Sequence, residues 1–391
     1  MRPSRGPGAT TAGQRTLGAL TTLVVSDLHL GSSTAADVLR RGPAREQLLA
    51  RLEGVDRLVL LGDLLELRHG PAREALAVAR PVLADIAAAL APGTPVVIVP
   101  GNHDHALIDP WLVGRGRRGA PEPLGLAEAV SPRKASPLAA AIERAMAPAS
   151  VELSYPGVWL RDDVWATHGH YLDVHATLPT FERLAAGAMS RLVGAVPQPQ
   201  ATPDDYERVL APVYAWIDAA AERAAPGRAA AGSGSAVQAY RLLSGGGRRP
   251  MAARAVAGLF PLAILGINRL GLGPVSADLR GPELRRSALR GIGEAVMRLG
   301  VPARHVIFGH SHRAGPLPGD DVAEWHVPGG PQLFNGGCWM YETHFLGGPD
   351  PRASPYWPGG LTVVEETDPP TPPRLERLLE TVPAADLRGA D

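Results

Sequence analysis

Cysteine and lysine are almost absent from this chain of 391 residues, which contains only Cys338 and Lys134. A single cysteine excludes an intrachain disulfide and favours a reducing compartment such as the cytoplasm. The 39 basic residues are nearly all arginine, and 39 acidic residues balance them. Because net charge is zero and no basic stripe rich in aromatic residues is present, long nucleic acid is disfavoured as a partner.

The sequence also lacks an apolar run long enough to cross a bilayer. Its most apolar stretch, Ala255–Ile267, is shorter than the roughly 20 residues required, and Pro261 interrupts it. We expect a helix there, either buried within the fold or facing lipid at a membrane surface. Residues 1–18 have no continuous apolar segment of the signal-peptide kind, so they are predicted to form a disordered tail.

Strand-like and helical patterns alternate in the first part of the chain, which predicts an α/β core. Helical stretches at Ala44–Leu52 and Ala72–Leu90 separate runs such as RLVLL and PVVIVP. Val151–Thr167 predicts two short strands joined by a polar turn at residues 161–163. Further strands are expected at Val306–Phe308, Leu333–Asn335 and Leu361–Glu365, so residues 19–170 and 301–367 form the predicted core.

Residues 171–300 have a different pattern, rich in alanine and poor in strand-like runs. Helical spacing recurs at residues 181–192, 206–223, 237–243, 252–270 and 282–299, which predicts a helical cap inserted into the core. Residues 368–391 are predicted to be a Pro-rich tail with one short helix.

Metal-binding side chains follow apolar runs at five places. They are Asp27 and His29, Asp63, Asn102 to Asp104, His168 and His170, and His310 and His312. Ligands at the carboxyl ends of strands in an open α/β sheet converge on one crevice, so we expect these groups to lie together. Nitrogen and oxygen ligands without thiolates suit Mn, Fe, Zn, Co or Ni. The set is large enough for two metal ions.

The ordered motifs DxH, GD, GNHD, H and GHxH resemble the calcineurin-like metallophosphoesterase superfamily over residues 23–364. This resemblance implies a four-layer αββα sandwich of two mixed sheets with a helical cap, and two divalent metal ions, manganese above all. It assigns Asp27, His29, Asp63 and His312 to the first metal, and Asp63, Asn102, His168 and His310 to the second. Asp63 would bridge the two.

Two stretches, SDLHLG and LGDLLEL, together with the helical insert, are similar to the bacterial UDP-diacylglucosamine hydrolase branch. Members of that branch cleave a pyrophosphate bond in a lipid precursor. The chain departs from the branch at His103, where arginine is typical, and at His170.

The resemblance makes His103 the group that gives a proton to the leaving oxygen, with Asp104 orienting its ring and raising its basicity. Alternatively, Asp104 is a helix N-cap. His170 is expected to assist substrate binding or to have a structural role in its loop. Arg115 and Arg117 are expected to contact substrate or to lie in a solvated loop. They fall within a GxGxxG pattern, but the prolines at 121 and 123 exclude a dinucleotide-binding helix.

The function expected from these features is hydrolysis of a phosphomonoester, phosphodiester or pyrophosphate by a metal-bridging hydroxide. The substrate would be a small molecule, and the apolar run extends this expectation to an amphipathic or lipid-linked one, handled in the cytoplasm or at the membrane periphery. One alternative is a nuclease or cyclic-nucleotide phosphodiesterase. An alternative of another class is a catalytically silent, metal-bound scaffold that uses its cap to bind a partner.

Overall fold

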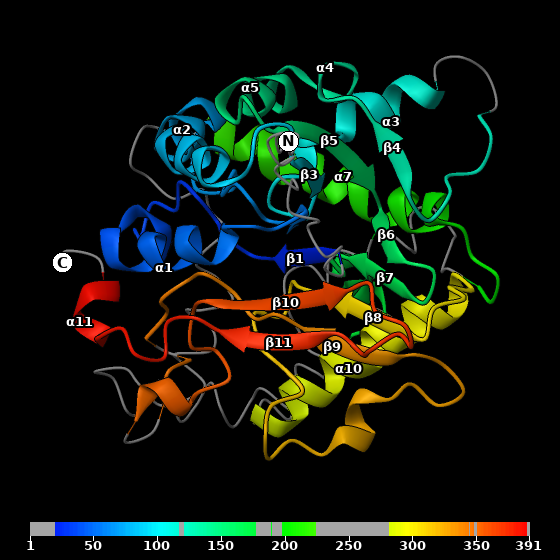
Figure 1. The fold of residues 1–391 in the computed structure, drawn as a ribbon. Helices are drawn as coiled ribbons and strands as arrows, with labels where there is room; N and C mark the ends of the chain where they lie inside the picture. Colours follow the sequence, from blue (N-terminus) through cyan, green and yellow to red (C-terminus); the bar gives the residue numbers. More distant parts are fainter. Residues whose placement is uncertain are drawn as a thin grey trace, which may run out of the picture.

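The computed structural model describes residues 20–116, 121–176, 198–223, 281–343, 345–347 and 350–388, together with Met189. Within these residues the strands form two sheets (Figure 1). The larger has the order β11-β10-β1-β2-β3-β5-β4, and the smaller has the order β6-β7-β8-β9. The strands are β1 (Thr21–Val25), β2 (Arg57–Leu61), β3 (Pro95–Val99), β4 (Glu128–Val130), β5 (Ser150–Tyr155), β6 (Gly157–Arg161), β7 (Val164–Thr167), β8 (His305–Phe308), β9 (Gln332–Asn335), β10 (Gly360–Glu365) and β11 (Arg374–Arg377).

Both sheets are mixed. In the larger one β1, β2, β3 and β5 run parallel, while β10 is antiparallel to β1 and β4 is antiparallel to β5. In the smaller one β7, β8 and β9 run parallel, and β6 is antiparallel to β7. The parallel strands of each sheet therefore end at a common edge, where the loops that follow them meet.

Alternate residues of the central strands face opposite sides of the larger sheet, as the period of a β-strand requires. Val24 and Val59 belong to a cluster that also contains Ile307 and Phe334 of the smaller sheet, so the two sheets pack face to face. Leu23, the neighbour of Val24, belongs to the cluster on the outer face. Both faces of the strands are thus buried, which explains their continuous apolar sequences.

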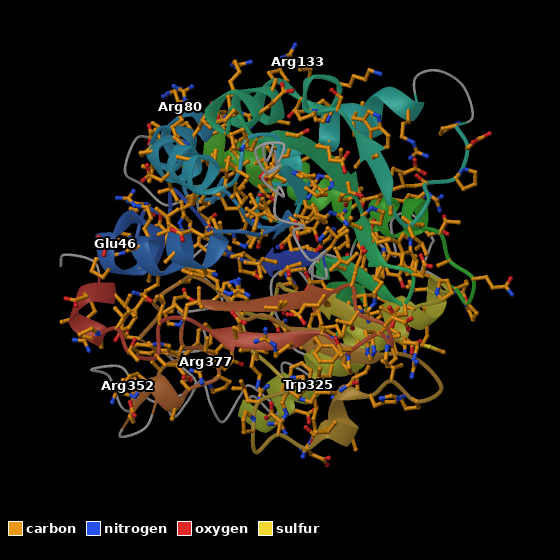
Figure 2. The ribbon with its side chains drawn as sticks, viewed as in Figure 1. Glu46, Arg80, Arg133, Trp325, Arg352 and Arg377 are labelled. Atoms are coloured by element: carbon orange, nitrogen blue, oxygen red, sulfur yellow. The ribbon has the colours of Figure 1, made fainter. Side chains whose placement is uncertain are left out.

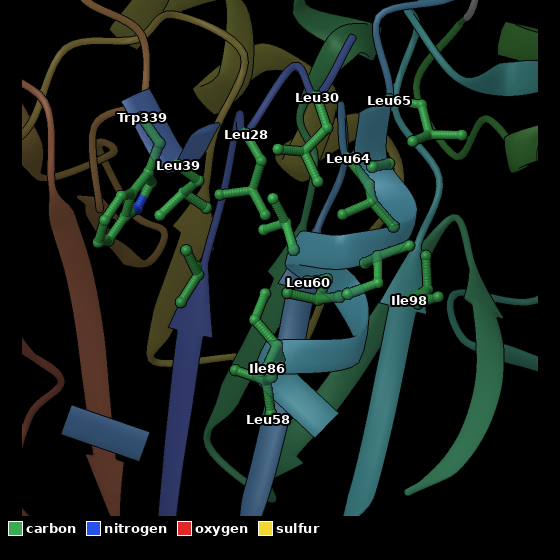
Figure 3. Close-up of a cluster of buried hydrophobic side chains, with 14 of the residues drawn as sticks. Leu28, Leu30, Leu39, Leu58, Leu60, Leu64, Leu65, Ile86, Ile98 and Trp339 are labelled. Carbon is green, nitrogen blue, oxygen red and sulfur yellow. The ribbon is translucent and has the colours of Figure 1, made fainter. Parts of the chain in front are cut away.

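Helices cover the outer face of each sheet. The larger sheet packs against α1 (Gly42–Leu52), α2 (Ala72–Ala89) and α5 (Pro137–Ala145), and the smaller one packs against α10 (Gly281–Arg298). Figure 3 shows Ile86 of α2 beside Leu58 and Leu60 of β2. In Figure 2, Arg80 and Arg133 extend from the outer surface, where they are exposed. This arrangement is the predicted four-layer αββα sandwich.

The cap helix expected at residues 206–223 lies within the described residues. This helix, α7 (Pro203–Glu222), begins with a capping box in which Thr202 and Asp205 satisfy each other's backbone N–H groups. It packs through Val209, Leu210 and Tyr214 against the 3-10 turn η3 (His170–Val174) and Ala295 of α10. The other described helical segments are η1 (Val38–Arg40), η2 (His105–Leu107), α3 (Asp109–Gly116), α4 (Pro132–Ala135), η4 (Val322–Trp325), η5 (Pro351–Ala353) and α11 (Ala384–Leu387).

The structure corrects three details of the sequence analysis. Val151–Thr167 lies in three strands, because β5 ends at Tyr155 in the larger sheet and β6 begins at Gly157 in the smaller one. The helix expected at 282–299 as part of the cap is α10, which covers the smaller sheet as a layer of the core. Beyond residue 367, β11 pairs with β10, so the core continues into the predicted tail.

The other expectations for the cap and the N-terminal tail lie outside the described residues. These are the helices at 237–243 and 252–270, including Ala255–Ile267, the tail 1–18, and the helix at 181–192 apart from Met189. Among the helices that the structure describes, none combines the length and the apolar character needed to span a membrane.

Candidate metal centre and active site

The predicted ligands lie on loops that leave the carboxyl ends of β1, β2, β3, β7 and β8. Five of them have a left-handed backbone, with φ between 46° and 64°: Asp27, His29, Asp63, His310 and His312. This conformation is unfavourable for residues other than glycine, and such strain gathers at functional sites. Each loop therefore turns sharply after its strand and directs its side chain into the crevice between the two sheets.

Asp27, His29 and His312 form one group of ligand atoms. The Nε2 atoms of His29 and His312 lie 3.0 Å apart, and His312 Nε2 is 3.4 Å from Asp27 Oδ1. Asp63 lies beside this group, with its Oδ2 atom 3.6 Å from His29 Nε2.

A second group contains Asp63, His168 and His310, with Asn102 between the two histidines. His168 Nε2 is 3.2 Å from Asp63 Oδ2, the same carboxylate oxygen that faces His29. The Asn102 Oδ1 atom lies 3.1 Å from His168 Nε2 and 3.0 Å from His310 Nδ1. Asp63 is thus the side chain that the two groups share.

The chemistry of these donor atoms fits two divalent cations. Carboxylate oxygens and imidazole nitrogens converge within 4.8 Å of one another in each group, and the amide oxygen of Asn102 joins the second. The facing nitrogens of His29 and His312 are so close that only one of them can carry a proton when both imidazoles are neutral. Asp27, Asp63 and His168 are also at most 1% exposed. Buried groups of this kind need a cation or protons for compensation, and the nitrogen and oxygen set suits borderline metals.

Without a metal, protons take part of that role. Burial acts to raise the pKa of Asp63, but the charges of His168 and His103 hold it well below its usual value. Burial correspondingly acts against a charged His168, yet the charge of Asp63 raises the pKa of that imidazole to about 9. The crevice therefore favours positive charge beside Asp63, which a bound cation would supply in place of the protons.

Carboxylates and carbonyls on the far side of the imidazoles fix the orientation of the ligands. His29 Nδ1 is 3.0 Å from Glu66 Oε2, and His310 Nε2 is 3.0 Å from Asp173 Oδ1. His168 Nδ1 is 3.1 Å from the carbonyl oxygen of Leu61. In each of these three histidines the other ring nitrogen faces the metal groups.

His103 lies at the edge of the centre, and Glu66 orients its ring in place of Asp104. Its Nδ1 atom is 2.9 Å from Glu66 Oε2, while Nε2 is 3.3 Å from a guanidinium nitrogen of Arg68. Burial and then the Arg68 charge lower the pKa of His103, although Glu66 acts in the opposite direction. Glu66 thus acts on the imidazole as a carboxylate partner is expected to, but burial and the Arg68 charge outweigh it.

Asp104 instead holds the loops around the site in place. Its carboxylate accepts backbone N–H hydrogen bonds from Leu64 and Gly101 at 2.7 Å and from Leu65 at 3.2 Å. It stands at the N-cap position of η2, but its side chain makes no capping hydrogen bond there. Burial, followed by the charge of Asp63, raises the pKa of Asp104 to about 6.

Two of the three side chains expected to contact substrate have other partners in the structure. His170 is 1% exposed and its Nε2 atom lies 3.2 Å from the Tyr155 hydroxyl, so it is part of the interior. Arg115 forms a 3.0 Å ion pair with Asp204 and lies over the Trp111 ring. Arg117 lies outside the described residues.

Glu66, Arg68 and Asp173 are site residues that the sequence analysis missed. Glu66 follows Asp63 by three residues and Asp173 follows His168 by five, so both are close in sequence to a recognised ligand. Their roles depend on which nitrogen of a distant histidine turns towards them. Proximity to a motif is a signal that could have suggested them, but their partners come from other strands.

The comparisons with known proteins agree with this site. A family model described as calcineurin-like phosphoesterase matches residues 20–194, a little under half of the chain. The match spans the first four motifs, and the fold brings His310 and His312 of the fifth to the same crevice. Residues 20–194 therefore match the calcineurin-like phosphoesterase family, as the motifs predict. Its class is that of the metal-dependent phosphoester hydrolases.

Among solved structures, a dimetal phosphatase from Danio rerio aligns over 92% of this chain and 98% of its own, at 12% identity and a TM-score of 0.30. A cold-active protein-tyrosine phosphatase from a psychrophilic Shewanella species aligns over 89% of this chain and 76% of its own, at 12% identity and a TM-score of 0.28. Such low scores carry no argument about this chain. No curated protein matches it.

Proposed function

We propose that this protein hydrolyses a phosphomonoester, phosphodiester or pyrophosphate bond with two divalent metal ions, manganese being the first candidate. Asp27, His29, Asp63 and His312 would hold one ion, and Asp63, Asn102, His168 and His310 the other. The observation that carries this proposal is the position of Asp63 Oδ2, which lies 3.6 Å from His29 Nε2 and 3.2 Å from His168 Nε2. When bound, the two ions would activate water as a nucleophile and withdraw charge from the phosphate.

The opening of the crevice lies on the side of three histidines. The side chains of His103, His310 and His312 are 22%, 14% and 19% exposed, whereas His168 is fully buried. A phosphate that enters from this side would meet His103 at one edge. Arg68, next to His103, adds a fixed positive charge at that edge.

His103 is the residue that we assign to the leaving oxygen. Its backbone N–H donates to Asp63 Oδ1 at 2.8 Å, so its position is tied to the central carboxylate. Glu66 holds the Nδ1 side, which leaves Nε2 beside Arg68 and the opening. A phosphate dianion bound there would favour the protonated imidazole, which could then donate its proton to the departing oxygen.

For the substrate we propose an amphipathic or lipid-linked phosphoester. The apolar run Ala255–Ile267 and the similarity of the first two motifs to a hydrolase of a lipid precursor support this choice. The single cysteine and the reducing environment that it favours support a cytoplasmic location, at the periphery of a membrane. The division into a catalytic core and a helical cap is part of the same proposal.

The test is hydrolysis of bis-p-nitrophenyl phosphate and p-nitrophenyl phosphate after metal stripping and reloading with Mn, Fe, Zn, Co or Ni. We expect metal-dependent release of p-nitrophenol from at least one of them. Binding of two metals without turnover would support the silent scaffold. Faster cleavage of single-stranded DNA or of a cyclic nucleotide than of either ester would support the nuclease or cyclic-nucleotide phosphodiesterase. Neutral net charge argues against long nucleic acid.

A further inference from the structure

A cavity of about 190 Å³ adjoins the metal centre and shares His310 with it. Its walls come from η3, α10, the end of β8, η4 and the side chains of Phe345 and Tyr356. Figure 2 shows Trp325 of η4 beside α10. The walls are mostly apolar and include Leu172, Ala176, Leu289, Phe308 and Trp325, and the stacked rings of Phe345 and Tyr356 add a further surface.

The charged side chains that line this cavity already have partners. Arg285 pairs with Glu324, and Arg313 forms an ion pair of 2.6 Å with Asp320 while it lies over the Trp325 ring. His310 is held between Asn102 and Asp173. Because the two guanidinium groups are already paired, the cavity is better suited to an apolar group than to a second phosphate.

Two buried polar atoms on the walls have no hydrogen-bond partner among the described residues. They are the Oδ2 atom of Asp173, an acceptor, and the Nε1 atom of Trp325, a donor. Both residues line the cavity and are at most 5% exposed. Buried polar groups are normally satisfied, so an unpaired acceptor and an unpaired donor on one cavity indicate a ligand that offers both functions.

We propose that this cavity binds the organic group attached to the substrate phosphate, and that this group is apolar with an amide or hydroxyl near the phosphorus. The inference rests on the proposed function, because His310 connects the cavity to the phosphate site. An apolar cavity of about 150 Å³ accepts a benzene ring, so this one holds roughly six carbon atoms. An amide would place its N–H towards Asp173 and its carbonyl towards Trp325.

The experiment measures binding of alkylphosphonates, from methyl to octyl, to the manganese-loaded protein by calorimetry. The dissociation constant should fall about fourfold for each added methylene, the value expected for its full burial. The fall should stop near six carbons, where the cavity is full. An acylaminomethylphosphonate of matched length should bind more tightly than the plain alkyl compound, and Trp325→Phe should remove that advantage.

Ala288→Phe places a ring in the cavity from α10. It should raise the dissociation constant of hexylphosphonate at least tenfold and so flatten the dependence on chain length. Ala176→Leu narrows the cavity from a second direction and serves if the first variant folds poorly. The matched control is Ala215→Phe, the same substitution at an exposed position of α7. This control should retain the full dependence on chain length.

Hydrolysis of the two nitrophenyl esters is followed in the same samples, which separates the two proposals. Affinity that increases with chain length, without hydrolysis of either ester, would overturn the proposed function and leave the cavity assignment standing. Hydrolysis with a flat series in the unmodified protein would overturn the cavity assignment alone. A series that stays steep in both Ala288→Phe and Ala176→Leu would also overturn it, since the chain would then bind elsewhere.

Discussion

Two buried polar clusters lie near the ends of the strands, and they differ in how their acceptors are satisfied. One is the metal centre around Asp63. The other, the Glu207 cluster, consists of Glu207 from α7 with His105, Tyr155 and Tyr171 from the core. Its carboxylate lies 3.0 Å from His105 Nε2 and accepts hydrogen bonds of 2.5 Å and 2.6 Å from the hydroxyls of Tyr155 and Tyr171.

The Glu207 cluster is complete without a ligand, because each oxygen of its carboxylate faces a donor. In the metal centre, by contrast, atoms that accept hydrogen bonds when the imidazoles are neutral face one another: Asn102 Oδ1 lies between two histidine nitrogens, and two imidazoles meet at 3.0 Å. Two clusters of similar composition therefore have different roles. The matched cluster joins α7 to the core, and the unmatched one is suited to cations.

The largest effect should follow from Asp63→Asn, which turns the shared anion of the metal centre into a neutral amide. Two cations would lose the charge that holds them together, so hydrolysis should fall by about 10³-fold or more with the fold retained. Elemental analysis and turnover on bis-p-nitrophenyl phosphate measure both consequences. Full metal content with unchanged turnover would remove Asp63 from the bridging role.

His103→Ala should leave both metals bound and lower turnover by about 10² to 10⁴, the usual contribution of a positioned proton donor. The loss should be smaller for p-nitrophenyl esters than for alkyl esters, because p-nitrophenolate leaves with little help. Loss of metal from this variant would show that His103 is a ligand, since it also lies in a group with His29 and Asp63.

Glu207→Ala should act on stability instead of chemistry. It leaves His105, Tyr155 and Tyr171 without their common acceptor, and breaking a buried network of this kind costs about 3 kcal/mol. Urea unfolding should show the loss, while the metal content stays the same. Glu207→Gln, which keeps an acceptor oxygen, is the control and should lose less. If Glu207→Ala has the stability of the unmodified protein but binds fewer metal ions, the Glu207 cluster supports the metal centre and not the stability of the fold.

Asp218 of α7 gives the smallest effect and a pH dependence. Burial raises its pKa to about 7, although the charges of Arg68 and His105 oppose the rise. Since the folded state prefers the neutral acid, its contribution to stability is present below about pH 4 and is lost as pH rises through 7. Asp218→Asn should therefore stabilise the fold at pH 8 and have little effect at pH 4. Equal melting shifts at both pH values would contradict this.

The sequence was sufficient to predict the strands that carry ligands, because motif and apolar run are adjacent in the chain. It could not show that Glu66 replaces Asp104 beside His103, since both carboxylates follow motif residues and only the folded loops decide which one reaches the ring. His170 illustrates the same limit. A histidine two residues after His168 looks available to substrate, yet η3 turns it inward to Tyr155.

The sequence likewise predicts that the sandwich has layers of helices and strands, but not which segments belong to each layer. Helical periodicity at 282–299 is the same for a cap helix and for a helix that covers a sheet, so α10 was assigned to the cap. The short strand β11 has a charged sequence, RLER, and its identity comes from pairing with β10. Both assignments depend on contacts with other elements, the smaller sheet for α10 and β10 for β11, which local patterns do not contain.

The order of the ligands along the chain also determines when the centre can form during synthesis. Asp27, Asp63, Asn102 and His168 emerge early, whereas His310 and His312 follow more than 140 residues after His168. At about 5 to 20 residues per second, a ribosome takes roughly 7 to 30 seconds to make that interval. During this time the nascent chain exposes an incomplete set of ligands in each metal group. If the protein holds two ions as we propose, their final loading is consequently a late event, which follows the synthesis of β8.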